Sequence, residues 1–211
     1  MVRKVAVSSF LGNFIEWFDY ASYSYFATTI ALVFFPTDNH TVAMLQTFGV
    51  FALSFILRPI GALFWGSYGD KKGRKAALAH SIMFMSGASF LIGCLPSYSV
   101  IGVGAPILLL LLRMVQGFSA SGEYAGAATF LGEYAPTSKR GIYCSLIPAS
   151  TAIGLLAGST LATLMTANMN SSAMVGWGWR VPFLLAGPLG LIVLYIRAKL
   201  AESPVYQSMN V

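Results

Sequence analysis

Six long apolar runs constrain what this chain can fold into more than any other feature of its sequence. They cover residues 8–33, 43–68, 76–95, 100–131, 142–167 and 178–200. A helix needs about 20 mainly apolar residues to cross the hydrocarbon core of a bilayer, and each run is long enough. We therefore predict an all-α membrane protein in which residues 1–211 form one bundle of six transmembrane helices.

Charged residues are scarce, and the basic ones are unevenly placed. Only 9% of the 211 residues are charged, whereas a soluble domain carries roughly a quarter. Ten of the thirteen Lys and Arg residues lie in four clusters, at residues 3–4, 71–75, 139–140 and 197–199. The intervening connections at 34–42, 96–99 and 168–176 contain none. By the positive-inside rule, both chain ends face the cytoplasm of a cell whose inner membrane holds the protein. The net charge of +6 is thus explained by orientation, and nucleic acid is not an expected partner.

The first run is not interpreted as a cleavable signal peptide. Its apolar part is long, and it contains Glu16, Asp19 and five aromatic residues between positions 14 and 23. No small-x-small cleavage pattern follows a short apolar core. We expect this run to remain as the first transmembrane helix.

Apart from the basic cluster at 197–199, six charged residues lie within or at the ends of the runs: Glu16, Asp19, Arg58, Arg113, Glu123 and Arg180. A charge at the membrane centre costs at least about 2.5–3.5 kcal/mol on insertion scales, so such residues face a partner, a cavity or an interface. Helical spacing places them in two polar stripes. The stripes are Asn13, Glu16, Tyr20 and Tyr23 with Asp19 beside them, and Arg113, Gln116, Ala120 and Glu123.

Two interpretations of the stripes remain open. They form the walls of a water-accessible path, or they hold a structural ion pair that locks two helices together. Glu123 is the weakest member of its stripe, because it can lie close enough to the cytoplasmic end to be solvated. Arg58, beside Pro59, is assigned to helix packing, and Arg180 to capping the outer interface.

Small residues indicate close helix packing. Gly122 and Gly126 form one GxxxG pair, and Gly154 and Gly158 form another. Such pairs let two helix backbones approach closely in a membrane. They predict a bundle and nothing more specific.

The connection between the second and third runs has an unusual composition. Its sequence, GSYGDKKGRK at 66–75, combines one acid, four cations and three glycines. Contact with anionic lipid explains the cations, since each is worth about 1 kcal/mol near an anionic leaflet. That interpretation leaves Asp70 and the glycine spacing unexplained.

This connection resembles the signature loop of the major facilitator superfamily, Gly-x-x-x-Asp-Lys-x-Gly-Arg-Lys. Further blocks resemble the metabolite:proton symporter family within it, in the family's order and over nearly the whole chain. They are GNFIEWFDY, ILRPIGALFWGSYGDKKGRK, RMVQGFSASGEYAGAATFLGEYAP, WGWRVPFLLAGPLG and ESPVY. The stretches around Gly-Glu-Tyr and Glu-Tyr-Ala-Pro are most similar to proline/glycine-betaine osmolyte symporters, although dicarboxylate and tricarboxylate carriers share much of the pattern. The fifth run lacks the Gly-Pro typical of drug/proton antiporters, which favours symport.

The resemblance implies a fold and a mechanism. Family members have twelve helices in two six-helix halves, so this chain resembles an amino-terminal half, built as two inverted three-helix repeats. Its expected partners are the bilayer, a small solute, and a missing carboxyl-terminal half or a second copy. No cofactor is expected beyond the coupling proton, and no metal. The expected function is half of a proton-coupled symporter for a zwitterionic osmolyte; a di- or tricarboxylate carrier half and a truncated, non-transporting fragment are the alternatives.

The resemblance also suggests roles for single residues. Asp19 and Glu16 are the candidate proton-coupling acids, and Arg113 is their charge partner or the anchor of a substrate carboxylate. The remaining candidates for the substrate and charge-partner site are Gln116, Tyr20, Tyr23 and Glu123. The candidates for a cytoplasmic gate are Gly66, Asp70, Lys71, Gly73, Arg74 and Lys75.

An enzyme is not expected. Ser119-Ala120-Ser121-Gly122 lacks the first glycine of the Gly-x-Ser-Gly motif of intramembrane serine proteases. Neither His40 nor His80 lies in a late run, where such a protease needs its base.

Overall fold

The computed structural model describes residues 2–201, and every regular element in that range is a helix. The ESPVY block at 202–206 lies outside the described residues. The helices are α1 (Val2–Tyr25), α2 (Ala27–Phe34), α3 (His40–Ile56), α4 (Arg58–Lys72), α5 (Arg74–Cys94), α6 (Tyr98–Ile101), α7 (Gly104–Ala120), α8 (Glu123–Tyr134), α9 (Arg140–Cys144), α10 (Leu146–Asn168), α11 (Ser171–Gly176) and α12 (Val181–Ala198), with short 3₁₀ turns η1 (Thr137–Lys139) and η2 (Gly178–Arg180).

Several of the expected runs are interrupted helices. The second run divides at Leu57 into α3 and α4, and Pro59 occupies the first turn of α4. Proline fits there because its missing N–H would have no partner in the preceding turn. The first run divides at Phe26, and nothing in the structure explains that break.

Five described helical segments are long and apolar enough to cross a membrane, namely His40–Lys72, Arg74–Cys94, Gly104–Tyr134, Thr137–Asn168 and Gly178–Ala198. The first run is helical over the same length but is not among them, because acids, serines and tyrosines lower its hydropathy. Its place in the bundle accounts for this composition. In α1, 14 of 24 residues are buried, so its polar side chains face protein rather than lipid.

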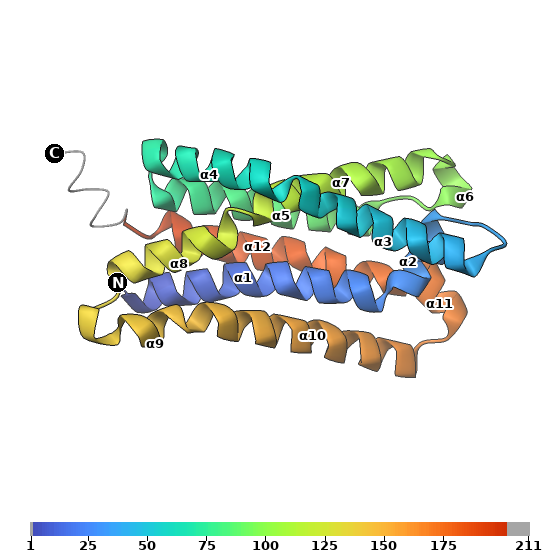
Figure 1. The fold of residues 1–211 in the computed structure, drawn as a ribbon. Coiled ribbons are helices and arrows are strands. Elements are labelled where there is room, and N and C mark those ends of the chain that lie inside the picture. The colour runs from blue at the N-terminus through green and yellow to red at the C-terminus, as the bar shows by residue number, and fades with distance from the viewer. Residues whose placement is uncertain (1, 202–211) are drawn as a thin grey trace.

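The helices pack as two related sets of three (Figure 1). The α1 helix packs on α10 and α12, α7 packs on α3 and α5, and α5 packs on α12. The first three spans are α1, α3–α4 and α5, and the last three are α7–α8, α10 and α12. If the first three are matched in order with the last three, the α1·α10 contact corresponds to α7·α3 and the α1·α12 contact corresponds to α7·α5. The two expected three-helix repeats require this correspondence.

Glycines permit the closest of these contacts. A Cβ added to Gly154 of α10 would lie 2.8 Å from the Phe14 carbonyl oxygen of α1. A Cβ on Gly117 of α7 would lie 1.9 Å from the Ser54 carbonyl oxygen of α3. The prediction that the Gly154 motif brings two backbones together is therefore confirmed.

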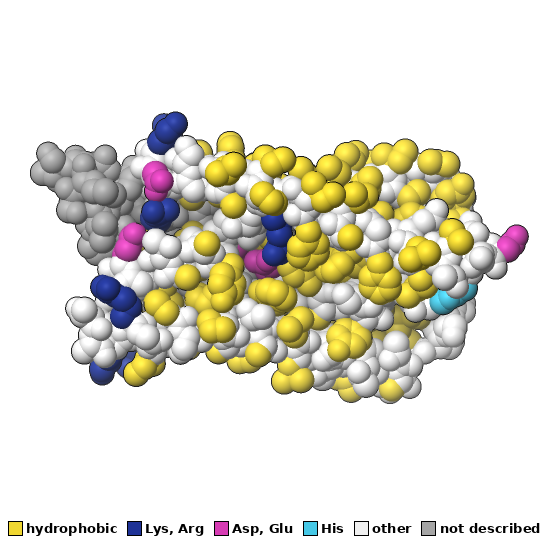
Figure 2. All heavy atoms as spheres, in the orientation of Figure 1, with side chains coloured by type: hydrophobic (Ala, Val, Ile, Leu, Met, Phe, Trp, Pro, Cys, Tyr) yellow, Lys and Arg dark blue, Asp and Glu magenta, His cyan; other side chains and the backbone are white. Residues whose placement is uncertain are grey.

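The two ends of the bundle differ in charge. Helix α1 begins and helix α12 ends at the same end of the bundle (Figure 1). Figure 2 shows most of the visible Lys and Arg side chains near that end, whereas the long sides are mainly hydrophobic. Leu63, Val100 and Leu191 are among the most exposed apolar side chains, as lipid-facing residues would be. The placement of the basic residues agrees with the predicted orientation, which itself stays a prediction.

Candidate functional site

A buried ion pair joins α1 and α7. Arg113 of α7 donates from Nη1 to Asp19 Oδ2 of α1 over 2.6 Å, with side chains only 1% and 3% exposed. The other carboxylate oxygen, Oδ1, accepts from Ser89 Oγ at 2.9 Å and from Gln116 Nε2 at 3.1 Å. The structure thus brings Asp19, Arg113 and Gln116 together, as the two stripes predicted. Ser89 of α5 was missed, because one serine in an apolar helix carries no distinctive signal.

Tyr23 forms one wall around this pair. The guanidinium carbon of Arg113 lies 3.9 Å from the centroid of the Tyr23 ring, a cation–π contact. The Tyr23 hydroxyl donates to the Thr47 carbonyl oxygen of α3 at 2.9 Å. Tyr23 therefore contacts the pair through its ring and ties α1 to α3 through its hydroxyl.

The Asp19 centre is not fully hydrogen-bonded. Arg113 Nε and Nη2 and Gln116 Oε1 are buried without a protein partner. Buried polar atoms of this kind are rare and call for an explanation, such as water or an alternative conformation. The unused donors of Arg113 allow it to exchange partners without leaving the site.

Glu16 pairs with Arg58 rather than with Arg113. The Arg58 Nη2 donor lies 2.6 Å from Glu16 Oε1, and the same nitrogen donates to the Tyr20 hydroxyl. The guanidinium carbon is 4.6 Å from the centroid of the Phe55 ring. The expectation that Arg113 serves both acids is wrong for Glu16, because Arg58 at the start of α4 faces α1.

This second pair borders an open cleft. The cleft has a volume of about 500 Å³, and Glu16 and Arg58 both line it. The Arg58 side chain is 27% exposed. Figure 2 shows acidic and basic side chains together near the middle of an otherwise mainly apolar face. Arg58, which the sequence suggested for packing alone, thus reaches the surface of the bundle.

A third pair is buried near the end of the bundle where α12 ends. Glu123 of α8 is fully buried and bonded to Arg197 of α12 in bidentate fashion. Arg197 Nη1 also donates to the Leu78 carbonyl oxygen, and Ser81 Oγ donates to Glu123 at 3.3 Å. The expectation that Glu123 could be solvated is wrong.

Arg197 was grouped with the cytoplasmic basic residues by sequence, and the structure corrects that assignment. Charge balance is the signal that could have revealed this role of Arg197, because an acid buried at one level of the bundle needs a cation at the same level. Gly12 of α1 makes room for the pair: a Cβ there would lie 2.0 Å from Glu123 Oε1 and 2.4 Å from Arg197 Nη2.

Asn13 leaves the predicted stripe. Its Nδ2 donates to the Ile147 carbonyl oxygen at 3.0 Å, to Ser150 Oγ at 2.8 Å and to Thr151 Oγ1 at 2.9 Å, all on α10. Because these contacts join α1 to α10, Asn13 holds two helices together and lies on a different side of α1 from Glu16.

The connection between α4 and α5 has defined geometry. Gly73 has φ +100°, a conformation that glycine adopts without the clash a Cβ would cause. Asp70 pairs with Arg74 one turn later at 3.0 Å, and Lys75 Nζ donates to the Ala198 carbonyl oxygen at the end of α12 at 3.0 Å. The connection is thereby hydrogen-bonded to the end of α12. Its gating role stays a prediction.

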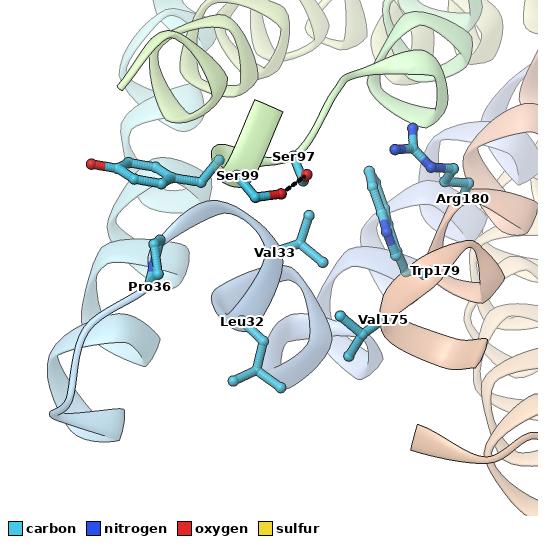
Figure 3. A pocket seen from close by; sticks show the side chains of 10 residues that line it. Leu32, Val33, Pro36, Ser97, Ser99, Val175, Trp179 and Arg180 are labelled. Atoms are coloured by element: carbon cyan, nitrogen blue, oxygen red, sulfur yellow. Dashed lines mark hydrogen bonds between the residues drawn. The ribbon is translucent and has the colours of Figure 1, made fainter. Parts of the chain in front are cut away.

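Arg180 lies at the opposite end of the bundle, in a pocket of about 490 Å³ (Figure 3). Its Nη1 donates to the Gly93 and Leu95 carbonyl oxygens, at 2.8 and 2.6 Å, where α5 ends. Its guanidinium carbon is 4.6 Å from the centroid of the Trp179 ring. These bonds agree with the capping role suggested for Arg180.

Comparison with solved structures defines the class. The fold is similar to that of the xylose transporter XylE of E. coli in an inward-open conformation, with a TM-score of 0.85 at 17% identity over 99% of this chain and 50% of XylE. For a partially occluded inward-open XylE the TM-score is 0.88 at 18% identity, over 99% and 52% of the two chains. The chain therefore has the fold of one half of XylE.

Sequence comparison supplies the family. Residues 4–211 match the sugar (and other) transporter family, and the chain belongs to that family within the major facilitator superfamily. It is 43% identical over 206 residues to the proline/betaine transporter of Salmonella typhimurium, covering 98% of this chain and 41% of that protein. It is 44% identical, with the same coverage, to the glycine betaine/proline/ectoine/pipecolic acid transporter OusA of Dickeya dadantii. The chain spans less than half the length of these relatives.

Proposed function

We propose that this chain forms the amino-terminal half of a proton-coupled symporter that works by alternating access. The observation that carries the proposal is the Asp19–Arg113 pair, a carboxylate and a guanidinium almost wholly excluded from solvent between two helices. Ionisable residues placed there are expensive and commonly mark ion or proton pathways in transporters. Membership of a transporter family supports this interpretation over a purely structural pair.

The pair can couple proton binding to a conformational change. A carboxylate beside a guanidinium is favoured in its charged form, whereas a carboxylate separated from its cation and from water binds a proton more readily. A rocking motion that changes the distance between Asp19 and Arg113 therefore changes proton affinity between the two states. Asp19 is our first candidate for this role, and Glu16 is the second.

The proposed substrate is a small zwitterionic osmolyte such as proline or glycine betaine. The support comes from the relatives, several of which are named as proline and betaine transporters. A di- or tricarboxylate carrier half is the alternative. The substrate would bind near the membrane midplane, where transporters of this type place it between two repeats.

The chain covers about half of the solved transporters that share its fold. We propose that a carboxyl-terminal six-helix half, or a second copy, completes the translocation path, and that both termini face the cytoplasm of the inner membrane. A chain of this length alone then does not transport. Robust uptake of proline or betaine by a demonstrated monomer would contradict this.

Uptake by a completed transporter tests the function. The chain is joined to the carboxyl-terminal part of the Salmonella typhimurium relative and reconstituted into liposomes. With an imposed inward proton gradient, labelled proline and glycine betaine should accumulate, and collapse of the gradient should abolish accumulation. Accumulation of succinate in place of both zwitterions would favour the carboxylate alternative.

A further inference from the structure

We propose that Glu16 and Arg58 bind the two charged ends of a zwitterionic solute, Arg58 its carboxylate and Glu16 its ammonium group. The sequence suggested Arg113 as the carboxylate anchor, and the structure points elsewhere. This inference rests on the proposed function and assigns proton binding and solute binding to different ion pairs. The Asp19–Arg113 pair serves the proton, and the Glu16–Arg58 pair serves the solute.

Access separates the two pairs. In the described part of the chain, three ion pairs join residues that are far apart in the sequence, and two of them are closed to solvent, with the Arg113 and Arg197 side chains 1% exposed. Arg58 is 27% exposed, its partner Glu16 is 2% exposed, and both residues line an open cleft of about 500 Å³. A solute of the size of proline fits such a volume and can reach Arg58 without opening the bundle.

Residues that line the same cleft also hold unused hydrogen-bonding atoms just beneath its surface. Glu16 Oε2, Arg58 Nε and Trp17 Nε1 are buried without a partner, and all three residues line the cleft. Leaving buried polar groups unpaired is unfavourable, and a ligand that bonds to them recovers the loss. Two of these atoms are donors suited to a carboxylate, and the third is an acceptor suited to an ammonium group.

The remaining cleft residues suit the cationic end of the solute. Phe55 and Tyr124 line the cleft with Trp17, and aromatic faces attract quaternary ammonium groups. A zwitterion that inserts between Glu16 and Arg58 replaces one ion pair by two and leaves the net charge of the site unchanged. A dicarboxylate would gain Arg58 but face repulsion from Glu16.

Ligand binding by the 211-residue chain tests the inference. The chain is placed in lipid nanodiscs, and saturation-transfer NMR titrations compare glycine betaine and proline with choline, which lacks the carboxylate, and with succinate. We expect saturable transfer to both zwitterions and much weaker transfer to choline and succinate. Tighter binding of succinate than of betaine, or no zwitterion binding at all, would overturn the inference.

Variants locate the binding. Arg58→Gln and Glu16→Gln should each weaken zwitterion binding by about tenfold or more. Arg58→Gln removes a charge-assisted hydrogen bond to the solute carboxylate, and Glu16→Gln removes the negative charge that faces the ammonium group. Arg58→Lys keeps the charge and should retain part of the affinity, while Arg180→Gln, at the other end of the bundle, should leave it unchanged. Circular dichroism verifies that each variant is folded. Wild-type affinity in folded Arg58→Gln would refute the assignment.

The transport assay separates this inference from the proposed function. If the completed transporter accumulates proline equally well with Arg58→Gln, the solute assignment fails and the symporter proposal stands. If the chain binds zwitterions through Arg58 but the completed protein shows no proton-driven uptake, the symporter proposal fails and the binding site stands.

Discussion

Arg113 Nη1 lies 2.6 Å from Asp19 Oδ2, and neither side chain lines the cleft that Arg58 borders. This pair, which is closed to solvent, is therefore distinct from the pair whose arginine a solute can reach. Protection suits a group that must keep its proton from leaking, and access suits a group that must meet a substrate. The same protection would also suit a structural lock, so the two roles need to be separated by mutation.

Asp19→Asn in the completed transporter should abolish uphill, proton-driven accumulation but spare solute exchange at equal concentrations, because exchange requires no net proton release. The measurement compares both assays in the same liposomes. Glu16→Gln, at the second candidate acid, should instead impair exchange as well, because Glu16 is assigned to the solute. If both substitutions leave full accumulation with an unchanged dependence on the proton gradient, the coupling role is wrong and the acids form a lock.

Arg113→Ala should impair accumulation and exchange alike, because it leaves Asp19 buried without its cation. Breaking a buried pair by removing one partner destabilises a protein by about 3–5 kcal/mol. The melting temperature in detergent should fall together with transport. Unchanged stability and transport would show that Asp19 finds sufficient compensation in Ser89 and Gln116.

Glu123→Gln should destabilise the chain far more than Asp70→Asn. Glu123 is buried with Arg197, whereas Asp70 is 66% exposed, and exposed pairs contribute only about 0–1 kcal/mol. Thermal unfolding of the two single variants in one detergent makes the comparison. Equal melting temperatures would contradict the structural importance of the Glu123–Arg197 pair.

Gly12→Ala should lower stability, whereas Gly87→Ala should leave it unchanged or raise it slightly. A Cβ on Gly12 would clash with both partners of the Glu123–Arg197 pair. In the described part of the chain, a Cβ on Gly87 would have no atom of another helix within 4 Å. Overpacking of this kind typically destabilises by about 1–3 kcal/mol. Both substituted positions are glycines within helices, so the gain in helix propensity is the same. A difference in melting temperature therefore reports the clash at Gly12.

A tag inserted at His40 should be external, and a reporter fused after residue 211 should be cytoplasmic. The reason is the concentration of Lys and Arg at the end of the bundle where α1 begins and α12 ends. Membrane-impermeant labelling of sealed, right-side-out cells measures the first site. Protection of His40 from the reagent would reverse the predicted orientation.

The sequence by itself determined the helical class, the approximate runs and the half-transporter relationship. Apolar length and the placement of Lys and Arg are properties of the chain that need no knowledge of packing. The polar stripes also placed Arg113 and Gln116 on one polar face and Asp19 beside another, because helical period places residues on one face of their own helix. Period says which side of a helix is polar but does not say which helix it meets.

Only the tertiary structure decided the partners. It paired Glu16 with Arg58, turned Asn13 towards α10, and moved Arg197 from the predicted basic surface into a buried pair with Glu123. Each of these assignments depends on how helices distant in sequence are rotated and docked against one another. That docking is set by small residues such as Gly12 and Gly154, whose missing side chains matter only once the opposing helix is in place.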